Sequence, residues 1–323
     1  MTDPRGVGVP LGGLAAANVA AWFWAYAAFA DRPTLLGSAL LAWLFGLRHA
    51  ADADHLAAID NVVRKLMQEG QRPRLVGLFF SLGHSTVVVL ACALIAGTAS
   101  SAAVERLRDL GGLIGTTVSA GFLLVIAAIN LRTLADLVRR RTAARDGAES
   151  VGGGLLARLL RPAIRMIRRP SHMYPLGFLF GLGFDTATEV GLLALAATQA
   201  AAGVSFVQVL IFPALFTAGM ALVDTADSVL MVGAYGWAFT DPGRKLAYNV
   251  TVTALSVLLA LGIGGVEAAG LLADRLDLQG SLWDMLETLA GRFADTGLGV
   301  VALFMAVWGL AVLLYRRRPP GVA

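Results

Sequence analysis

The sequence predicts an all-α, polytopic membrane protein with about eight transmembrane helices. Hydrophobic residues make up 57% of the 323 residues and charged residues only 15%, whereas a soluble globular domain carries about 25% charged residues. Long apolar segments recur along the chain, and most basic residues lie in the connections between them. This composition excludes a disordered chain and a coiled coil, and the single cysteine, Cys92, excludes a disulfide scaffold.

Eight segments are long and apolar enough to cross a hydrocarbon core, which takes about 20 helical residues. The first four are residues 12–30, 35–59, 75–98 and 110–135, and the last four are 175–200, 204–237, 246–272 and 297–315. The sixth is too long for one straight span. We expect Pro213 near its start and the glycine-containing run 232–237 at its end to leave a shorter core and an interfacial piece.

The basic residues divide the chain and orient it. We predict a first membrane half (1–137), a basic cytoplasmic loop (138–174) and a second membrane half (175–323). With both termini in the cytoplasm, most of the 26 lysines and arginines are cytoplasmic, and the outside loops hold only Arg32, Arg106, Arg108, Arg275 and Arg292. This asymmetry predicts a multi-pass protein of the cell membrane. It also accounts for the net charge of +4, so we expect a lipid bilayer and no nucleic acid as partner.

Ionisable side chains inside the predicted spans identify the candidate site. An ionised group at the bilayer centre costs about 2.5–3.5 kcal/mol, so such groups must face one another, a cavity or a bound cation. Acids three or four residues apart on a helix repel each other unless a cation or proton lies between them. The candidates are His49, Asp52, Asp54 and His55 in the second span, His84 in the third, Asp185 and Glu189 in the fifth, and Asp224 and Asp227 in the sixth.

The ligand types indicate a divalent first-row transition metal. Imidazole suits ions such as nickel, cobalt and zinc, whereas sites made only of oxygen suit magnesium, calcium and manganese. On an ideal helix His49, Asp52 and His55 share one face, and Asp54 falls on the far side. Binding of one ion by all four residues therefore requires a distorted helix, and the sequence leaves both the ideal and the distorted helix open.

Short motifs recur in the two halves of the chain. Leu44-Phe-Gly-Leu47 precedes the acids of the second span, and Leu179-Phe-Gly-Leu182 precedes those of the fifth. Phe80-Ser-Leu-Gly-His84 is matched by Phe216-Thr-Ala-Gly-Met220 in the following spans. The predicted topology gives the two units opposite directions, which indicates an inverted repeat of spans 2–4 and 5–7. Such repeats place the substrate site of a transporter near the bilayer midplane.

At these motifs the chain resembles the nickel/cobalt permease family (NiCoT), single-chain transporters of Ni²⁺ and Co²⁺ with eight spans. The family signature, His-x4-Asp-His, lies here within RHAADADHLAAIDN (48–61), and further family motifs read FFSLGHSTVV (79–88), LGFDTATEV (182–190) and GMALVDTADS (219–228). The chain departs at Leu56 and Ser228, where the family usually has Ile and Gly. The resemblance implies ligand and transport roles for His49, Asp54 and His55, and it extends them to Asp52, His84, Asp185, Glu189, Asp224 and Asp227.

The resemblance implies a permease, not an enzyme, that takes up nickel and/or cobalt as its substrate without a cofactor. It would bind the ion at a midplane His/Asp site and move it by alternating access. No GxxxxGK[ST] loop occurs in the sequence, so we expect no ATPase partner.

Three other functions remain as alternatives. They are a metal-sensing or metal-delivery subunit of a larger transporter, nickel/cobalt efflux, and an intramembrane metal-dependent hydrolase. The absence of HExxH counts against the hydrolase. Related efflux proteins often carry a histidine-rich central loop, whereas this loop has only His172, which favours uptake.

Overall fold

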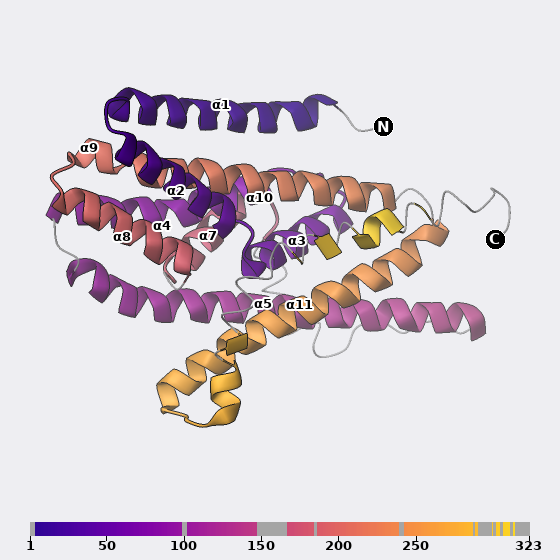
Figure 1. The fold of residues 1–323 in the computed structure, drawn as a ribbon. Helices are drawn as coiled ribbons and strands as arrows, with labels where there is room; N and C mark the ends of the chain where they lie inside the picture. The colour runs from indigo at the N-terminus through magenta and orange to yellow at the C-terminus, as the bar shows by residue number, and fades with distance from the viewer. Residues whose placement is uncertain are drawn as a thin grey trace.

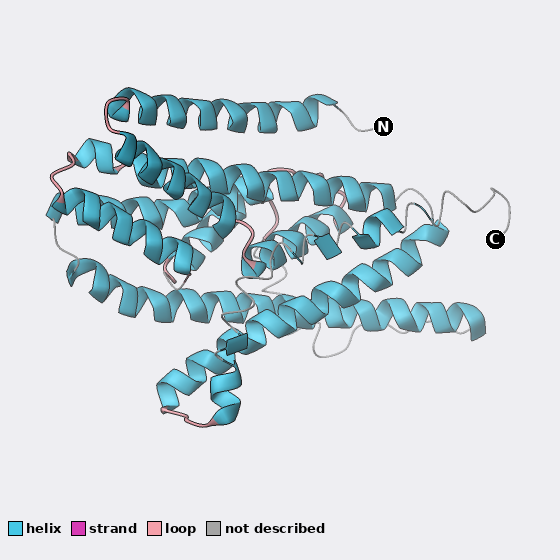
Figure 2. Ribbon diagram, viewed as in Figure 1, coloured by secondary structure: helices cyan, strands magenta, loops and turns pink. Residues whose placement is uncertain are grey.

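The computed structural model describes residues 4–98, 102–146, 167–183, 186–238 and 242–286 and a few positions between 288 and 313. This part of the chain is helical without strands (Figure 2), which confirms the predicted all-α class. The helices are α1 (Pro4–Phe29), α2 (Pro33–His49), α3 (Ala53–Gln68), α4 (Val76–Thr98), α5 (Ala102–Asp146), the 3₁₀ helix η1 (Pro170–His172), α7 (Met173–Gly181), α8 (Ala187–Ala201), α9 (Phe206–Val209), α10 (Ile211–Ala238) and α11 (Pro242–Leu276).

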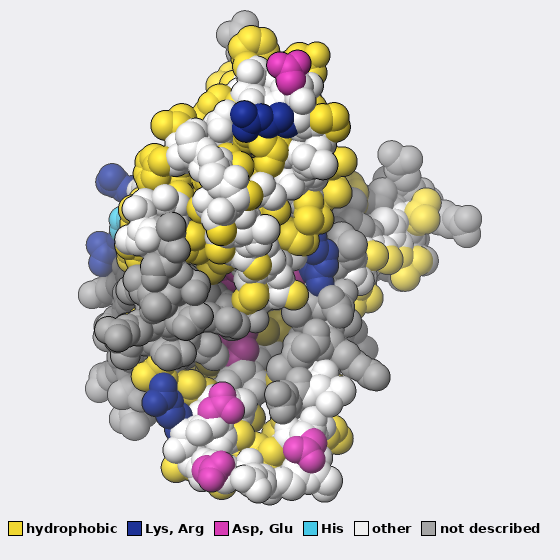
Figure 3. Space-filling view, turned by 60° about the vertical axis from the view of Figure 1, so that its left-hand side comes forward, with side chains coloured by type: hydrophobic (Ala, Val, Ile, Leu, Met, Phe, Trp, Pro, Cys, Tyr) yellow, Lys and Arg dark blue, Asp and Glu magenta, His cyan; other side chains and the backbone are white. Residues whose placement is uncertain are grey.

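Several of these helices can cross a membrane. The stretches that are long and apolar enough are Gly8–Phe29, Val76–Thr98, Gly111–Ala135, Phe206–Gly236 and Val250–Leu276, and the bent pair α2–α3 adds one more if it forms a single span. Large apolar side chains such as Phe23, Leu90 and Leu258 are exposed on them, and Figure 3 shows hydrophobic side chains over much of the described surface. The chain is therefore a multi-pass membrane protein. Most of the predicted span 297–315 lies outside the described residues.

The second predicted span is a broken helix. α2 ends at His49, α3 begins at Ala53, and the two helices are bent by 51° relative to each other. Asp52 is the N-cap of α3, with φ −67° and ψ 145°. Aspartate is a favoured N-cap residue, but this carboxylate makes no cap hydrogen bond and instead contacts Arg48 and His49. Of the two alternatives that the sequence leaves open for this segment, the structure shows the distorted helix.

The fifth predicted span is also divided. α7 ends at Gly181, and α8 begins at Ala187 with Thr186 as its N-cap. The Thr186 hydroxyl accepts a hydrogen bond from the backbone N–H of Glu189 at 3.4 Å, which satisfies one free donor of the first turn. The span predicted over 175–200 thus contains two helices, α7 and α8, in place of one continuous helix.

The span predicted over 204–237 needs one correction, and α5 extends beyond its predicted span. Pro213 lies in the first turn of α10, where proline is tolerated, and the helix continues through 232–237 to Ala238 without the predicted interfacial break. α5 continues to Asp146, so the start of the predicted basic loop is helical. Most of the remaining loop lies outside the described residues.

In each half of the chain, a broken helix packs on an unbroken helix that belongs to the other half. α2 packs on α10, and α7 packs on α4. A Cβ atom on Gly46 of α2 would lie 2.1 Å from the carbonyl oxygen of Phe216, and one on Gly177 of α7 would lie 2.1 Å from that of Phe80. Only glycine permits such close backbone contact. Phe80 and Phe216 are the matching positions of the repeated motif, so each half contacts the other through it.

α5 and α11 form a further helix pair that covers this bundle. They pack against each other, both contact α3, and α5 also contacts α7. In Figure 1 the pair crosses below the other helices, whereas α1 lies on the far side along α10. The helix break at 50–52, the C-terminal end of α7 and the N-terminal end of α8 therefore lie in the middle of the bundle, where polar side chains are buried.

Candidate metal centre

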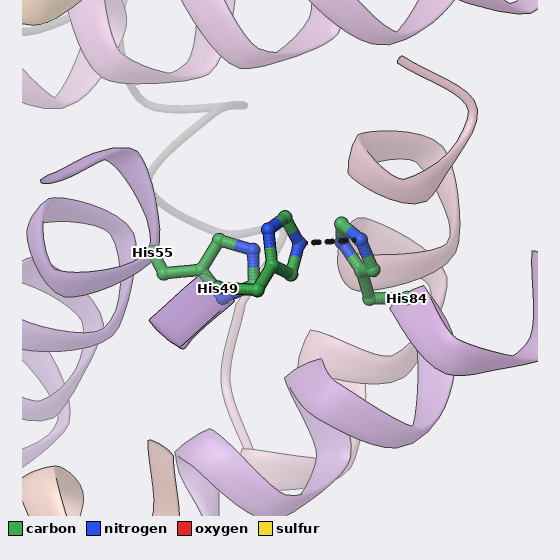
Figure 4. A group of neighbouring side chains, drawn as sticks. All are labelled: His49, His55 and His84. Atoms are coloured by element: carbon green, nitrogen blue, oxygen red, sulfur yellow. Dashed lines mark hydrogen bonds between the residues drawn. The ribbon is translucent and has the colours of Figure 1, made fainter. Parts of the chain in front are cut away.

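Three histidines converge at the helix break in the middle of the bundle (Figure 4). His49 is the last residue of α2, His55 lies in the first turn of α3, and His84 lies on α4. One ring nitrogen from each lies within 4.8 Å of the other two. None of the three residues is more than 3% exposed. Because α2 and α3 are bent relative to each other, His49 and His55, which are close in sequence, approach His84 from different directions.

The two ring nitrogens of His49 face different groups. Nε2 lies 2.9 Å from Nε2 of His84. Nδ1 lies 3.0 Å from a carboxylate oxygen of Asp52 and 3.1 to 3.2 Å from the hydroxyls of Thr188 and Thr186. A carboxylate beside Nδ1 accepts its proton and leaves the lone pair on Nε2, as the partners of metal-bound imidazoles do. Asp52 therefore holds the His49 ring with Nε2, the nitrogen that carries the lone pair, facing His84.

Two buried carboxylates border the imidazoles. Glu189 Oε1 lies 2.8 Å from His84 Nε2 and 4.0 Å from His49 Nε2, and its other oxygen accepts a hydrogen bond from the Thr186 hydroxyl at 2.9 Å. Asp224 Oδ2 lies 3.4 Å from His55 Nδ1 and accepts a hydrogen bond from the Ser81 hydroxyl at 2.7 Å. Each carboxylate is thus placed to neutralise a cation held by the rings.

The spacing of the donor atoms suits a transition-metal ion. In a square-planar or octahedral site with metal–nitrogen bonds of about 2.1 Å, adjacent ligand atoms are about 3.0 Å apart. The two Nε2 atoms of His49 and His84 lie 2.9 Å apart. Both ring nitrogens of His55 are buried without a hydrogen-bond partner within the described residues, although buried polar atoms normally have one. The mixed nitrogen and oxygen donors fit nickel or cobalt.

Of the four candidate residues in the second span, the two histidines belong to the convergent group and the two aspartates do not. His49 and His55 belong to the convergent group, whereas Asp52 contacts His49 and Arg48. Asp54 is half-buried in the first turn of α3 and is not one of the convergent residues. The sequence pattern therefore locates the site, but it does not separate the two aspartates from the imidazoles.

Only some of the residues predicted for the transport pathway lie beside the histidines. His84 and Glu189 lie among the imidazoles, and Asp224 contacts His55. Asp227 is buried one turn after Asp224, and Asp185 lies outside the described residues. Ser81 was not predicted as a site residue, although its position three residues before His84 on one helix face is a usable signal.

Replacing Asp52 with Asn is expected to weaken nickel binding about 10–100-fold, because an amide no longer fixes His49 with its lone pair on Nε2. Calorimetric titration of the purified protein measures the affinity. Asp31→Asn, an equal charge change at an exposed position, is expected to leave it unaltered. Equal affinities for the Asp52→Asn and Asp31→Asn proteins would show that His49 is oriented without Asp52.

Comparisons with known proteins place the chain in a family. The profile of the NicO family, high-affinity nickel-transport protein, matches residues 35–314. The hydrogenase nickel incorporation protein HupN of Bradyrhizobium diazoefficiens is 57% identical over 322 residues, which cover 97% of this chain and 84% of that protein. A high-affinity nickel transport protein of Cupriavidus necator is 51% identical over 316 residues, covering 94% and 90%.

A relative described as a cobalt transporter is also similar. The cobalt transport protein NhlF of Rhodococcus rhodochrous is 40% identical over 298 residues, which cover 88% of this chain and 84% of that protein. No solved structure matches the chain. The profile match includes both helix breaks and every residue of the histidine cluster. The chain therefore belongs to the NicO high-affinity nickel-transport family, which is a family of transporters and not of enzymes.

Proposed function

We propose that this protein is a cell-membrane permease that takes up Ni²⁺ and/or Co²⁺ as its substrate. The observation that carries the proposal is the convergence of His49, His55 and Glu189, from the ends of broken helices, with His84 on the unbroken helix α4. Such groups are costly inside a membrane unless they serve an ion or one another. The similarity to nickel transport proteins and to a cobalt transport protein supports the same function.

The ion is held first by imidazole nitrogens. Nε2 of His49 and of His84 bind adjacent positions, and His55 and Glu189 approach from the other sides. Asp52 and Asp54 belong to the same site and supply negative charge close to the rings. A dication that has shed its water thus exchanges hydration for fixed nitrogen and carboxylate ligands, which are the donors that nickel and cobalt favour.

The permease has eight spans, both termini in the cytoplasm, and an inverted repeat of spans 2–4 and 5–7. Each Leu-Phe-Gly-Leu motif lies at the end of a half-helix, and each helix break is followed by an N-cap residue in extended conformation, Asp52 or Thr186. Each half-helix then packs on a helix of the other half, α2 on α10 and α7 on α4. A midplane site between two such units is exposed to each side in turn when one rocks against the other.

The membrane potential is sufficient to concentrate the ion without an ATPase partner. A dication that enters at −100 mV gains about 4.6 kcal/mol, twice the value for a single charge. We therefore expect the purified chain, alone in liposomes, to accumulate radiolabelled nickel when the interior is negative, and to accumulate much less when an ionophore removes the potential. Excess Co²⁺ should inhibit this uptake more strongly than Mn²⁺, because imidazoles favour cobalt.

The same assay separates the alternatives. Liposomes without protein provide the background. A chain that binds nickel but moves none by itself would be a sensing or delivery subunit. Transport that occurs only out of nickel-loaded liposomes would indicate efflux.

A further inference from the structure

Ser228 of α10 forms a hydrogen-bonded bridge to the first turn of α4. Its side chain is fully buried, and its Oγ accepts a hydrogen bond from the backbone N–H of Gly77 at 2.8 Å. Gly77 is the second residue of α4, and the N–H groups of a first turn have no carbonyl partner within their own helix. The Ser228 hydroxyl donates its proton to the carbonyl oxygen of Asp224, one turn earlier on α10, at 3.1 Å. α10 thus supplies a cap for α4.

The backbones of the two helices are in close contact at this bridge. A Cβ atom on Gly77 would lie 2.0 Å from the carbonyl oxygen of Asp224 and 2.9 Å from the hydroxyl oxygen of Ser228. Only glycine permits such an approach. The bridge therefore fixes both the distance between α4 and α10 and their register along each other.

The same turn of α10 carries the carboxylate that faces His55. Asp224 is fully buried, and its Oδ2 lies 3.4 Å from His55 Nδ1 and accepts a hydrogen bond from the Ser81 hydroxyl at 2.7 Å. Ser81 lies one turn after Gly77 on α4, and its Oγ is also 2.8 Å from the Gly77 carbonyl oxygen. Gly77 thus contacts Ser228 through its N–H and Ser81 through its carbonyl group. These contacts form a closed ring across α4 and α10 that includes the Asp224 carboxylate.

We propose that Ser228 is a positioning residue for the metal centre. Its hydroxyl holds α10 on α4 in the register at which Ser81 orients the Asp224 carboxylate toward His55. Within the described residues this hydroxyl bonds to Gly77 and Asp224 and to none of the histidines, so it acts on the ion through Asp224. The inference rests on the proposed transport function.

Ser228 adjusts the strength of metal binding and does not create the site. Glycine, which the family motif usually has at this position, could make neither of the two hydrogen bonds of the hydroxyl. A carboxylate that already faces the site does not have to be ordered when the ion arrives, and such preorganisation strengthens binding. We expect the gain to be that of one hydrogen bond, about 2–10-fold in affinity.

Nickel titration of the full chain in lipid nanodiscs, together with uptake kinetics in liposomes, tests this role. Ser228→Ala should weaken nickel binding about 2–10-fold and raise the KM for uptake by a similar factor, with the maximal rate kept. A merely structural contribution would instead reduce the amount of folded protein, and therefore the maximal rate, at an unchanged KM.

Ser119→Ala provides the matched control. Ser119 is a buried serine of α5 whose hydroxyl has no hydrogen-bond partner within the described part of the chain. The same loss of a buried hydroxyl there should leave the nickel affinity and the KM at their wild-type values.

A double substitution tests whether Ser228 acts through the Asp224 carboxylate. Ser81→Ala removes the hydroxyl that orients this carboxylate and should weaken binding by itself. The Ser81→Ala/Ser228→Ala protein should then bind nickel within about 2-fold of the weaker single variant, because residues that act as one unit do not have additive effects. Two factors that multiply would overturn the proposal, as would a Ser228→Ala protein with wild-type affinity and KM.

If Ser228→Ala does not fold, Ser228→Gly removes the same hydroxyl and should show the same weakening, and wild-type affinity there would overturn the proposal. Absence of nickel binding by the wild-type protein would overturn the proposed function together with this inference. Equal affinities of the wild-type and Ser228→Ala proteins would overturn the inference alone.

Discussion

Replacing His84 with alanine is expected to abolish nickel accumulation as completely as replacing His49. His84 Nε2 lies 2.9 Å from His49 Nε2 and 2.8 Å from Glu189 Oε1, so one substitution removes an imidazole and the nearest partner of a buried carboxylate oxygen. Loss of an outer partner of a metal ligand costs about 10–100-fold in affinity, and loss of a ligand should cost at least ~100-fold. Uptake of radiolabelled nickel by cells, with calorimetric binding to purified protein, measures both effects.

The control for this experiment is another histidine. His172 lies in η1 and is not part of the cluster, so His172→Ala should transport normally. Normal uptake by the His84→Ala protein would contradict the three-histidine site. It would indicate that His49, Asp52, Asp54 and His55, which all lie around the α2–α3 break, hold the ion without α4.

Replacing Gly46 with alanine is expected to prevent α2 from packing on α10. The new Cβ would lie 2.1 Å from the carbonyl oxygen and 2.8 Å from Cα of Phe216. Both atoms belong to the backbone, so no side-chain rotation relieves the clash. We expect a destabilisation above about 4 kcal/mol, at the upper end for single substitutions, and loss of uptake, because α2 carries His49. Thermal unfolding in detergent and the yield of folded membrane protein measure the effect.

Gly37 on the same helix provides a matched control. A Cβ atom there would meet nothing within 4 Å. Alanine is favoured over glycine inside a helix by about 0.5–1 kcal/mol, so Gly37→Ala should unfold at the same or a slightly higher temperature. A Gly46→Ala protein that unfolds like the Gly37→Ala protein would show that the two helices do not require this contact.

The sequence was sufficient for the helical class of the protein and for its family. Hydrophobic content and the free-energy cost of placing charged side chains in a membrane can both be summed residue by residue, without knowledge of the fold. They predict a helical membrane protein and indicate that His49, His55 and Asp224 do not face lipid; all three are buried within the protein. The four motifs of the resemblance also indicated the family that the comparisons establish.

The helix breaks were not predictable from periodicity. Ala50 and Ala51 favour a continuous helix, and nothing nearby in the sequence forbids one. Asp52 and Thr186 stand in extended conformation as the N-caps of α3 and α8. Neither residue type by itself distinguishes an N-cap from a position inside a helix, and the contacts of Asp52 with Arg48 and His49 have the spacing of pairs on a continuous helix.

The sequence by itself determined which segments are apolar and which side chains are too costly to face lipid. Tertiary structure decided which of those side chains meet. His84 and Glu189 are 105 residues apart, and Asp60 and Ser256 are 196 apart. Their contacts depend on how closely backbones pack, as where Gly46 contacts Phe216. Hydropathy is a sum over neighbours in sequence, whereas such packing depends on the shapes of helices from opposite halves of the chain.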